Sequence, residues 1–131
     1  MRLLGGCFCG ELRYEADGAP FNESICHCTI CRRTTGAPMV AWFSAPRERF
    51  RWVRGEPAQF RSTPVAVRSF CPRCGTQLTF AHDEFPDEVD VTTASLDDPH
   101  AVPPRDHIFA RSRLQWVRLD DGLPRFPTDH E

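Results

Sequence analysis

Hydrophobic and polar residues alternate along several short stretches of the chain. Leu12, Tyr14 and Ala16 share one face of such a stretch, and Arg13 and Glu15 share the other. The same period of two recurs at four later places: Phe50 and Trp52, Leu78 and Phe80, Val89 and Val91, and Leu114 and Trp116. This period is typical of β-strands with one buried face. Because 12 prolines and 8 glycines divide the chain into short segments, the pattern predicts a mainly β fold with about eight to ten short antiparallel strands.

One stretch has the character of a helix instead. Residues 29–36 read TICRRTTG, which suits a helix of about two turns. Thr29 is placed to cap its start, and Gly36 is placed to end it. The many prolines oppose longer helices elsewhere.

Length and composition limit the class of protein. The 131 residues fit one domain, residues 1–131, with a modest core. A hydrophobic content of 40% and a charged content of 26% are typical of a folded globular protein. No apolar run approaches the roughly 18 residues of a membrane helix. The formal net charge is −2, without the basic excess of nucleic-acid-binding proteins. We therefore expect neither a membrane nor a nucleic acid as a partner.

The number of cysteines bears on the cellular compartment. There are seven of them, an odd number. The segment from Leu4 to Cys7 (LGGC) loosely resembles a lipoprotein processing site, but only three residues precede it, too few for a signal segment. We therefore expect a cytoplasmic protein. Disulfides are rare in that compartment, so metal ligation explains the cysteines better.

The seven cysteines fall into three groups. The groups are Cys7 and Cys9; Cys26, Cys28 and Cys31; and Cys71 and Cys74. The last group reads CPRCG, a zinc knuckle whose tight turn aims two sulfurs at one point, and a glycine also follows Cys9. Two such pairs can close a tetrahedral site of four thiolates, so we expect a structural zinc. Spacing alone leaves open which groups pair.

The middle group, CHCTIC at residues 26–31, offers only three cysteines. If the two outer pairs share one zinc, a zinc on the middle group keeps an open fourth position, as catalytic and binding metals do. Alternatively, His27 or a distant histidine completes a closed site. His27 lies between two ligands, and its side chain is expected to point away from the metal. We favour the open site over the closed one, and zinc over an iron–sulfur cluster, whose usual cysteine spacings differ.

Five segments of the chain together resemble a known family. They are GGCFCGELRYE, CHCTICRRTTGAP, FCPRCGTQL, SLDDP and the dipeptide HI at residues 107–108. In order and spacing they are similar to the glutathione-dependent formaldehyde-activating enzymes, a family that includes centromere protein V. The resemblance extends from Leu3 to Pro124.

The resemblance implies the β-tent fold, built around a structural zinc, and two zinc ions per chain. It assigns the structural zinc to Cys7, Cys9, Cys71 and Cys74, and the catalytic zinc to Cys26, Cys28 and Cys31. It also implies a carbon–sulfur lyase that handles thiol–aldehyde adducts, such as S-hydroxymethylglutathione from glutathione and formaldehyde. Two alternatives remain: a non-catalytic carrier that binds glutathione or a similar small thiol at zinc, and a structural protein with both zinc sites closed.

Further residues are candidates for the site. His27 and His107 are the histidines nearest to these motifs, and either could donate or accept a proton during catalysis. Arg32 and Arg33 follow the last cysteine of the middle group, so they are candidates for binding the carboxylates of a thiol such as glutathione. Arg68, just before the CPRCG knuckle, is another arginine candidate.

Three aromatic side chains raise a related question. Trp42, Phe43 and Trp116 could wall a pocket for the substrate, but large aromatic residues more often pack in a core. We therefore expect all three to contribute to the core of the domain.

Overall fold

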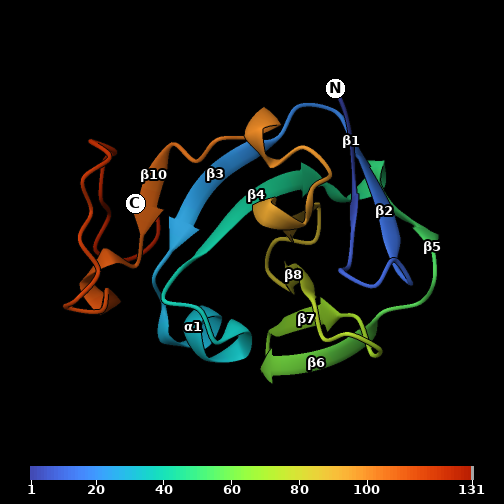
Figure 1. Cartoon of the computed structure of the whole chain (residues 1–131), viewed down its shortest axis with the longest axis horizontal. Helices are drawn as coiled ribbons and strands as arrows, with labels where there is room; N and C mark the ends of the chain where they lie inside the picture. Colours follow the sequence, from blue (N-terminus) through green and yellow to red (C-terminus); the bar gives the residue numbers. More distant parts are fainter. Residues whose placement is uncertain (131) are drawn as a thin grey trace.

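The computed structural model describes residues 1–130, and its secondary structure is mainly β (Figure 1). Within these residues there are ten strands, in agreement with the number predicted, and one α-helix, α1 (Thr29–Thr35). The strands are β1 (Arg2–Gly6), β2 (Arg13–Asp17), β3 (Phe21–Cys26), β4 (Val40–Pro46), β5 (Phe50–Arg54), β6 (Ala58–Thr63), β7 (Ala66–Phe70), β8 (Gln77–His82), β9 (Glu88–Thr92) and β10 (Asp106–Ile108). Short 3-10 turns are η1 (Arg47–Arg49), η2 (Thr93–Ser95), η3 (Pro99–Ala101) and η4 (Ala110–Ser112).

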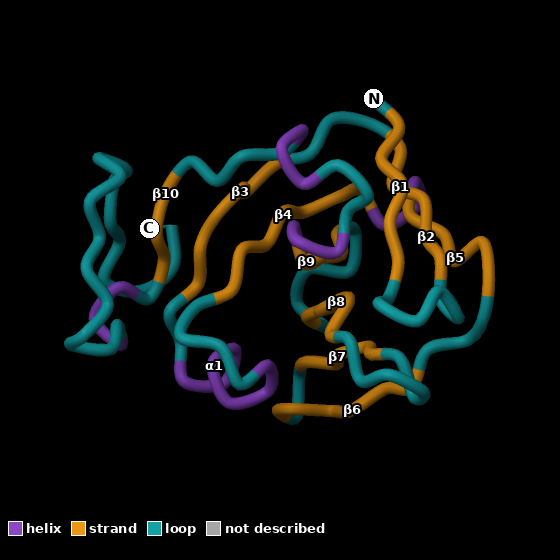
Figure 2. Tube along the Cα trace, viewed as in Figure 1, coloured by secondary structure: helices purple, strands orange, loops and turns teal. Residues whose placement is uncertain are grey.

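The strands form two open sheets. The small sheet has the order β1-β2-β5, and the large sheet has the order β10-β3-β4-β9-β8-β7-β6. Neighbouring strands are antiparallel except β10 and β3, which are parallel. The small sheet lies at one end of the molecule and the C-terminal segment at the other, with β3 and β4 arching between them (Figures 1 and 2).

The large sheet divides its side chains between two faces, because successive residues of a strand point to opposite sides. One row of cross-strand neighbours, formed by Thr79, Val91 and Phe43, is buried against the core. The adjacent row lies on the opposite face and consists of Arg68, Phe80, Asp90 and Ser44. Four central strands thus present an apolar face to the core and a mixed polar and aromatic face to the other side.

The core lies between the small sheet and the apolar face of the large sheet. At its centre is Tyr14, which is fully buried and packs on Phe50 and Trp52 with ring centroids 5.4 and 6.1 Å away. The Tyr14 hydroxyl forms a hydrogen bond of 2.7 Å with Ser95 Oγ. A side chain at Gly5 would lie 2.4 Å from this hydroxyl, so the close approach of β1 requires glycine there.

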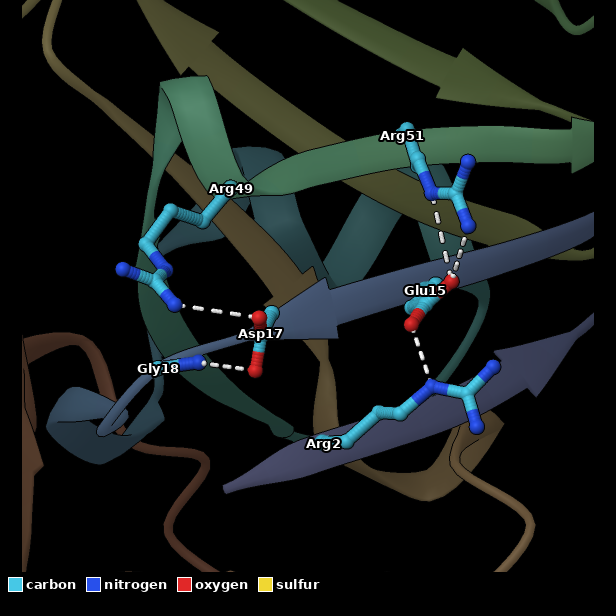
Figure 3. Close-up of polar contacts among 6 residues, drawn as sticks. All are labelled: Arg2, Glu15, Asp17, Gly18, Arg49 and Arg51. Atoms are coloured by element: carbon cyan, nitrogen blue, oxygen red, sulfur yellow. Dashed lines mark hydrogen bonds and ion pairs between the residues drawn. The ribbon is translucent and has the colours of Figure 1, made fainter.

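The outer face of the small sheet carries ion pairs (Figure 3). Glu15 on β2 pairs with Arg2 on β1 and with Arg51 on β5, the latter at 2.7 Å, and these partners lower the pKa of the Glu15 carboxyl. Asp17 pairs with Arg49 at 3.0 Å. Each pair links neighbouring segments at the solvent side, so the alternation predicted for residues 12–16 is realised as one buried and one charged face.

The helix prediction for residues 29–36 is confirmed in position, but its N-cap is wrong. Cys28, not Thr29, is the N-cap: its sulfur accepts a hydrogen bond from the Cys31 amide. Gly36 ends the helix in the left-handed conformation, with φ of 70°. In the part of the chain that the structure describes, no helix is both long enough and apolar enough to span a membrane.

The strand predicted around Leu114 and Trp116 is wrong. These residues lie in a turn closed by a 3.0 Å hydrogen bond from the Val117 amide to the Leu114 carbonyl, and the Arg113 guanidinium donates to the Val117 carbonyl. The backbone groups of this segment form hydrogen bonds within the turn, so they do not pair with a neighbouring strand. Trp116 is 71% exposed, so its predicted place in the core is wrong too, whereas Phe43 is fully buried as expected.

Candidate metal centres

Four cysteines meet where the two sheets join. Cys7 directly follows β1 of the small sheet, and Cys71 directly follows β7 of the large sheet. Each starts a tight turn: the Cys7 amide donates to the Leu12 carbonyl, and the Cys71 amide to the Thr76 carbonyl. These turns bring Cys9 and Cys74 beside them, and the four Sγ atoms lie within 4.8 Å of one another. The outer cysteine pairs, far apart in sequence, therefore form one group.

The spacing of these sulfurs fits a tetrahedral zinc site. Cys7 Sγ lies 3.6 Å from Cys9 Sγ, which lies 3.8 Å from Cys71 Sγ. A zinc–sulfur bond of about 2.3 Å places tetrahedral ligands about 3.8 Å apart, whereas a disulfide needs about 2.05 Å. Backbone amides of Leu12 and Cys74 point at the sulfurs of Cys7 and Cys71, at 3.2 and 3.4 Å. Such donors stabilise thiolates, so the group fits zinc in both geometry and donor chemistry.

Thr76 adds to this stabilisation. Its hydroxyl lies 3.2 Å from Cys74 Sγ, and hydrogen bonds from Thr76, through its hydroxyl and its backbone, lower the pKa of Cys74 to about 5. Cys71 is fully buried and Cys74 is exposed. The group thus reaches from the core to the surface, with a complete set of four ligands.

The three remaining cysteines form a second group around the start of α1. Cys26 is the last residue of β3, Cys28 is the N-cap of α1 and Cys31 lies in its first turn. Their Sγ atoms also lie within 4.8 Å of one another. Amides of Cys28 and Cys31 approach the sulfurs of Cys26 and Cys28 at 3.5 and 3.3 Å. The Cys28 sulfur that caps α1 is therefore also one of three sulfurs that could hold a metal ion.

Hydrogen bonding within this group favours a thiolate at Cys28. The thiols of Cys26 and Cys31 donate toward its sulfur, and together with the Cys31 amide and the nearby Arg68 charge they lower the pKa of Cys28 to about 2. The same partnership raises the pKa of Cys26. Three converging sulfurs, one of them readily ionised, form a donor set that suits zinc.

The second group lies in the wall of a large cleft. The cleft has a volume of about 750 Å³ and occupies the polar face of the large sheet. Alternate residues of five strands line it: Ser24 and Cys26, Trp42 and Ser44, Ala66 and Arg68, Phe80 and His82, and Glu88 and Asp90. Ile108, Phe109, Asp129 and His130 add a wall from the C-terminal segment. Trp42 is buried as expected, but in a small apolar cluster with Cys26 and Cys31 apart from the main core, and it also borders the cleft.

Arg68 is the cation of this cleft. It is only 4% exposed, and its Nη2 lies 3.6 Å from Cys31 Sγ. The guanidinium carbon lies 4.9 Å from the centre of the Phe80 ring and 5.8 Å from that of Trp42. Stacking on aromatic rings is favourable for a guanidinium and holds its plane in place.

His27 and His107 are brought together, but away from the cleft. Both are fully buried, and His27 Nε2 lies 2.9 Å from His107 Nδ1. His107 Nε2 lies 2.7 Å from a carboxylate oxygen of Asp121, which fixes the direction of the chain of hydrogen bonds. Burial lowers the pKa of His27. Its Nδ1 is buried and has no hydrogen-bond partner in residues 1–130.

The structure separates the arginine candidates. Arg68 enters the cleft, whereas Arg32 and Arg33 are absent from its lining and lie in the last turn of α1. Cations are favourable there because the helix C-terminus carries partial negative charge. Sequence reasoning missed the cleft residues Phe80, Asp90, His130 and their neighbours. Strand alternation could have placed Asp90 on the face opposite Val89 and Val91. It grouped Phe80 with Leu78 on the core side, but a register irregularity between β7 and β8 turns Phe80 toward the cleft instead.

Comparisons with known proteins support the resemblance found in the sequence. The family model described as glutathione-dependent formaldehyde-activating enzyme matches residues 2–112. A Halomonas elongata protein provisionally named a glutathione-dependent formaldehyde-activating enzyme is 29% identical, over 92% of this chain and 82% of its own length. A Schizosaccharomyces pombe protein named as an uncharacterized lyase is 32% identical, over 60% of this chain and 56% of its own.

A solved structure shares the fold. The crystal structure of a Rhodobacter sphaeroides protein matches with a TM-score of 0.60 and 24% identity, covering 94% of this chain and 98% of that one. At this level of identity the likeness concerns the arrangement of the strands alone.

Proposed function

The chain belongs to the family of glutathione-dependent formaldehyde-activating enzymes, and on that premise we propose that it makes and breaks the carbon–sulfur bond of thiol–aldehyde adducts. S-hydroxymethylglutathione, formed from glutathione and formaldehyde, is the first candidate, since the name of the Halomonas relative includes both of these compounds. We further propose two zinc ions per chain: a structural one held by Cys7, Cys9, Cys71 and Cys74, and a catalytic one held by Cys26, Cys28 and Cys31.

The observation that carries this proposal is the different setting of the two cysteine groups. The four-cysteine group is complete in itself and lies where the sheets join. The three-cysteine group has one ligand fewer and borders a cleft of about 750 Å³. A cleft of that size accommodates a small peptide thiol. Three ligands beside an open volume are the arrangement of catalytic rather than structural zinc sites.

Cys26, Cys28 and Cys31 would hold a zinc ion, which would supply a Lewis acid that lowers the pKa of a substrate thiol. The chain itself supplies the surroundings. Trp42 and Phe80 form an apolar wall beside the sulfurs and exclude water from part of the cleft. Arg68 supplies a fixed positive charge next to Cys31. The substrate thiol therefore enters a site that is partly shielded from water and carries the positive charge of Arg68.

The histidines have a different part in this proposal. His27 is held by His107 and Asp121 and does not line the cleft. A proton carried by His27 at the site would have to use Nδ1, since Nε2 is engaged with His107. We propose first that His27 positions the backbone between Cys26 and Cys28, and that a role in proton transfer is secondary.

A rate measurement tests the function. Zinc-loaded protein is mixed with glutathione and formaldehyde, and exchange between free formaldehyde and S-hydroxymethylglutathione is followed by NMR against the spontaneous reaction. We expect acceleration proportional to protein concentration. Arg61→Gln is a matched surface control, because Arg61 is exposed and lies outside the cleft. A rate equal to the spontaneous one with several thiols and aldehydes refutes an enzyme of this type.

The same experiment separates the enzyme from a carrier. A protein that only binds small thiols gives saturable binding, lost in Cys28→Ser, with no acceleration in either direction. An adduct-specific enzyme gives both binding and acceleration, and Cys28→Ser abolishes both.

A further inference from the structure

Arg68 is a buried cation without an acidic partner. None of the ion pairs within residues 1–130 involves it. Its three polar contacts are long: Nε to Ser62 Oγ at 3.3 Å, Nη1 to Thr34 Oγ1 at 3.4 Å and Nη2 to Cys31 Sγ at 3.6 Å. Buried charges are normally paired, because losing water is costly for an ion. The guanidinium therefore lacks a strong acceptor.

The donor count gives the same result. A guanidinium has five N–H donors, and three of them are used in the contacts with Ser62, Thr34 and Cys31. The remaining two belong to Nη1 and Nη2, the atoms that also contact Thr34 and Cys31. Since Arg68 lines the cleft, these donors are available to a ligand bound next to the cysteines.

Arg68 is the charge beside the three cysteines that can attract a negatively charged oxygen. Three thiolates would leave one net negative charge on a zinc dication. An additional oxyanion beside the cysteines would be repelled by the sulfurs without this cation. Asp90, which faces the same cleft two strands away across Phe80, forms no direct ion pair with Arg68, although the Arg68 charge acts on its carboxyl across the cleft.

We propose that Arg68 binds the aldehyde oxygen and the alkoxide that develops on it. This rests on the proposed function. In the reaction the thiol sulfur forms a bond to the carbonyl carbon, the π electrons of the C=O bond move onto oxygen, and the proton released by the thiol reaches that oxygen by way of water. Arg68 is not the proton donor in this step, because the guanidinium group of arginine is not deprotonated in proteins. Its part is to hold a charge that grows in the transition state.

The position of the guanidinium makes this assignment specific. Stacking on Phe80 and Trp42 limits its rotation, and its contact with Cys31 Sγ places it directly beside a proposed metal ligand. In this proposal, the oxygen on the carbon attached to the substrate sulfur meets the same edge of the guanidinium. Arg32 and Arg33, which lie outside the cleft lining, cannot take this part.

Binding of small thiols tests the assignment without catalysis. The probes are mercaptoacetate, whose negatively charged oxygens lie one carbon farther from sulfur than the alkoxide oxygen does, uncharged 2-mercaptoethanol, and cationic cysteamine. Calorimetry on zinc-loaded wild type is expected to give at least about tenfold tighter binding of mercaptoacetate than of cysteamine. In Arg68→Gln the preference is expected to fall to about threefold or less. Arg61→Gln retains the wild-type preference.

Kinetics supplies the second readout. In Arg68→Gln we expect kcat for adduct formation to fall by about a hundredfold, with a much smaller change in KM for the thiol, because the interaction strengthens in the transition state. Arg68→Lys keeps the charge but not the fork, and is expected to retain an intermediate kcat. Zinc content is measured for each variant. If Arg68→Gln loses metal, the kcat of Arg68→Lys is the value that tests the role of Arg68.

The outcomes distinguish this assignment from the proposed function. Acceleration by wild type, with unchanged kcat and unchanged thiol preference in the variants that hold two zinc ions, overturns the role of Arg68 but keeps the enzyme. Absence of acceleration by wild type overturns the proposed function, while the thiol preference still decides whether Arg68 binds an anion.

Discussion

The two cysteine groups consist of the same residue type but lie in different surroundings. The four-cysteine group is built from two tight turns, carries glycines at Gly10 and Gly75 with φ of 81° and 82°, and joins the small sheet to the large one. The three-cysteine group is built from a strand end and a helix start and borders a cleft. The first group offers four sulfurs and reaches the surface only at Cys74, whereas the second offers three sulfurs in the wall of the large cleft.

The difference shows that burial alone does not separate a structural from a reactive site. Cys74 of the four-cysteine group is exposed, whereas Cys26 and Cys31 of the three-cysteine group are 4% and 5% exposed. What separates the groups is the number of ligands and the neighbours of the sulfurs. The first group has hydrogen-bond donors that hold it together; the second has, in addition, a cation and two aromatic rings that face a cleft.

The largest expected effect is on folding, from loss of a ligand in the four-cysteine group. Cys71→Ser removes a fully buried sulfur that links the sheets. Because metal binding at such a site contributes folding free energy directly, we expect a loss of several kcal/mol, a large part of the total stability of a domain. Circular dichroism with thermal unfolding and zinc analysis measures it. A Cys71→Ser protein that remains folded with two zinc ions would contradict the structural assignment.

The next effect is on activity, from the matching change in the three-cysteine group. Cys28→Ser is expected to lower the rate of adduct formation by at least about a hundredfold, as the loss of a catalytic metal does, while the chain stays folded. One zinc per chain should remain. Serine can still cap α1 through its oxygen, so the helix itself is retained. Equal losses of stability in Cys28→Ser and Cys71→Ser would remove the distinction between the two groups.

A smaller effect concerns the cleft carboxyl Asp90. Burial, with contributions from Glu88 and Asp129, raises the pKa of Asp90 to about 6. The folded state therefore favours the protonated form, and stability decreases as the pH rises from the unfolded pKa of about 4 to the folded value of about 6. Asp90→Asn removes this cost and can still accept from Ser44 Oγ, which lies 2.6 Å from Asp90 Oδ1.

The stabilisation by Asp90→Asn is expected to be about 1 kcal/mol larger at pH 8 than at pH 5. Urea unfolding of wild type and variant at both pH values measures the difference. Glu15, on the outer face of the small sheet, gives the contrast. Arg2 and Arg51 lower its pKa, so its contribution to the stability of the fold is present at neutral pH and is lost on acidification. If the effect of Asp90→Asn on stability were the same at both pH values, the pKa of the Asp90 carboxyl would not be raised in the folded state.

The smallest effect is expected at Tyr14, which supports the small sheet. Tyr14→Phe removes the 2.7 Å hydrogen bond to Ser95 Oγ. Ser95 keeps its bonds to Thr92, so the loss should be about 0.5–1 kcal/mol in stability. Activity and thiol binding should not change, since neither residue lines the cleft. A drop in activity without a drop in thermal stability would show that the small sheet acts on the reactive group after all.

The alternation of apolar and polar residues predicted strands correctly where another strand lies beside them to pair with. The alternation at residues 12–16, 50–52, 78–80 and 89–91 corresponds to β2, β5, β8 and β9. In β8 the strand is right but the face of Phe80 is wrong, because a register irregularity turns it to the cleft while Leu78 stays in the core. The alternation failed at residues 114–116, where hydrogen bonds within the turn replace those of a partner strand. Alternation reports that one face can be buried, not that a strand is present to pair with it.

The sequence by itself predicted groups of possible metal ligands, most of the short strands and the family, because cysteine spacing, alternation and motif order are properties of neighbouring residues. The family resemblance also paired the outer cysteine groups, and the structure brings these four sulfurs together. Only the tertiary structure decided that Arg68 enters the cleft while Arg32 and Arg33 do not, and that His27 is turned toward His107. These outcomes depend on register between strands distant in sequence. A register shifted by one residue would send Arg68 and Phe80 to the opposite face of the sheet.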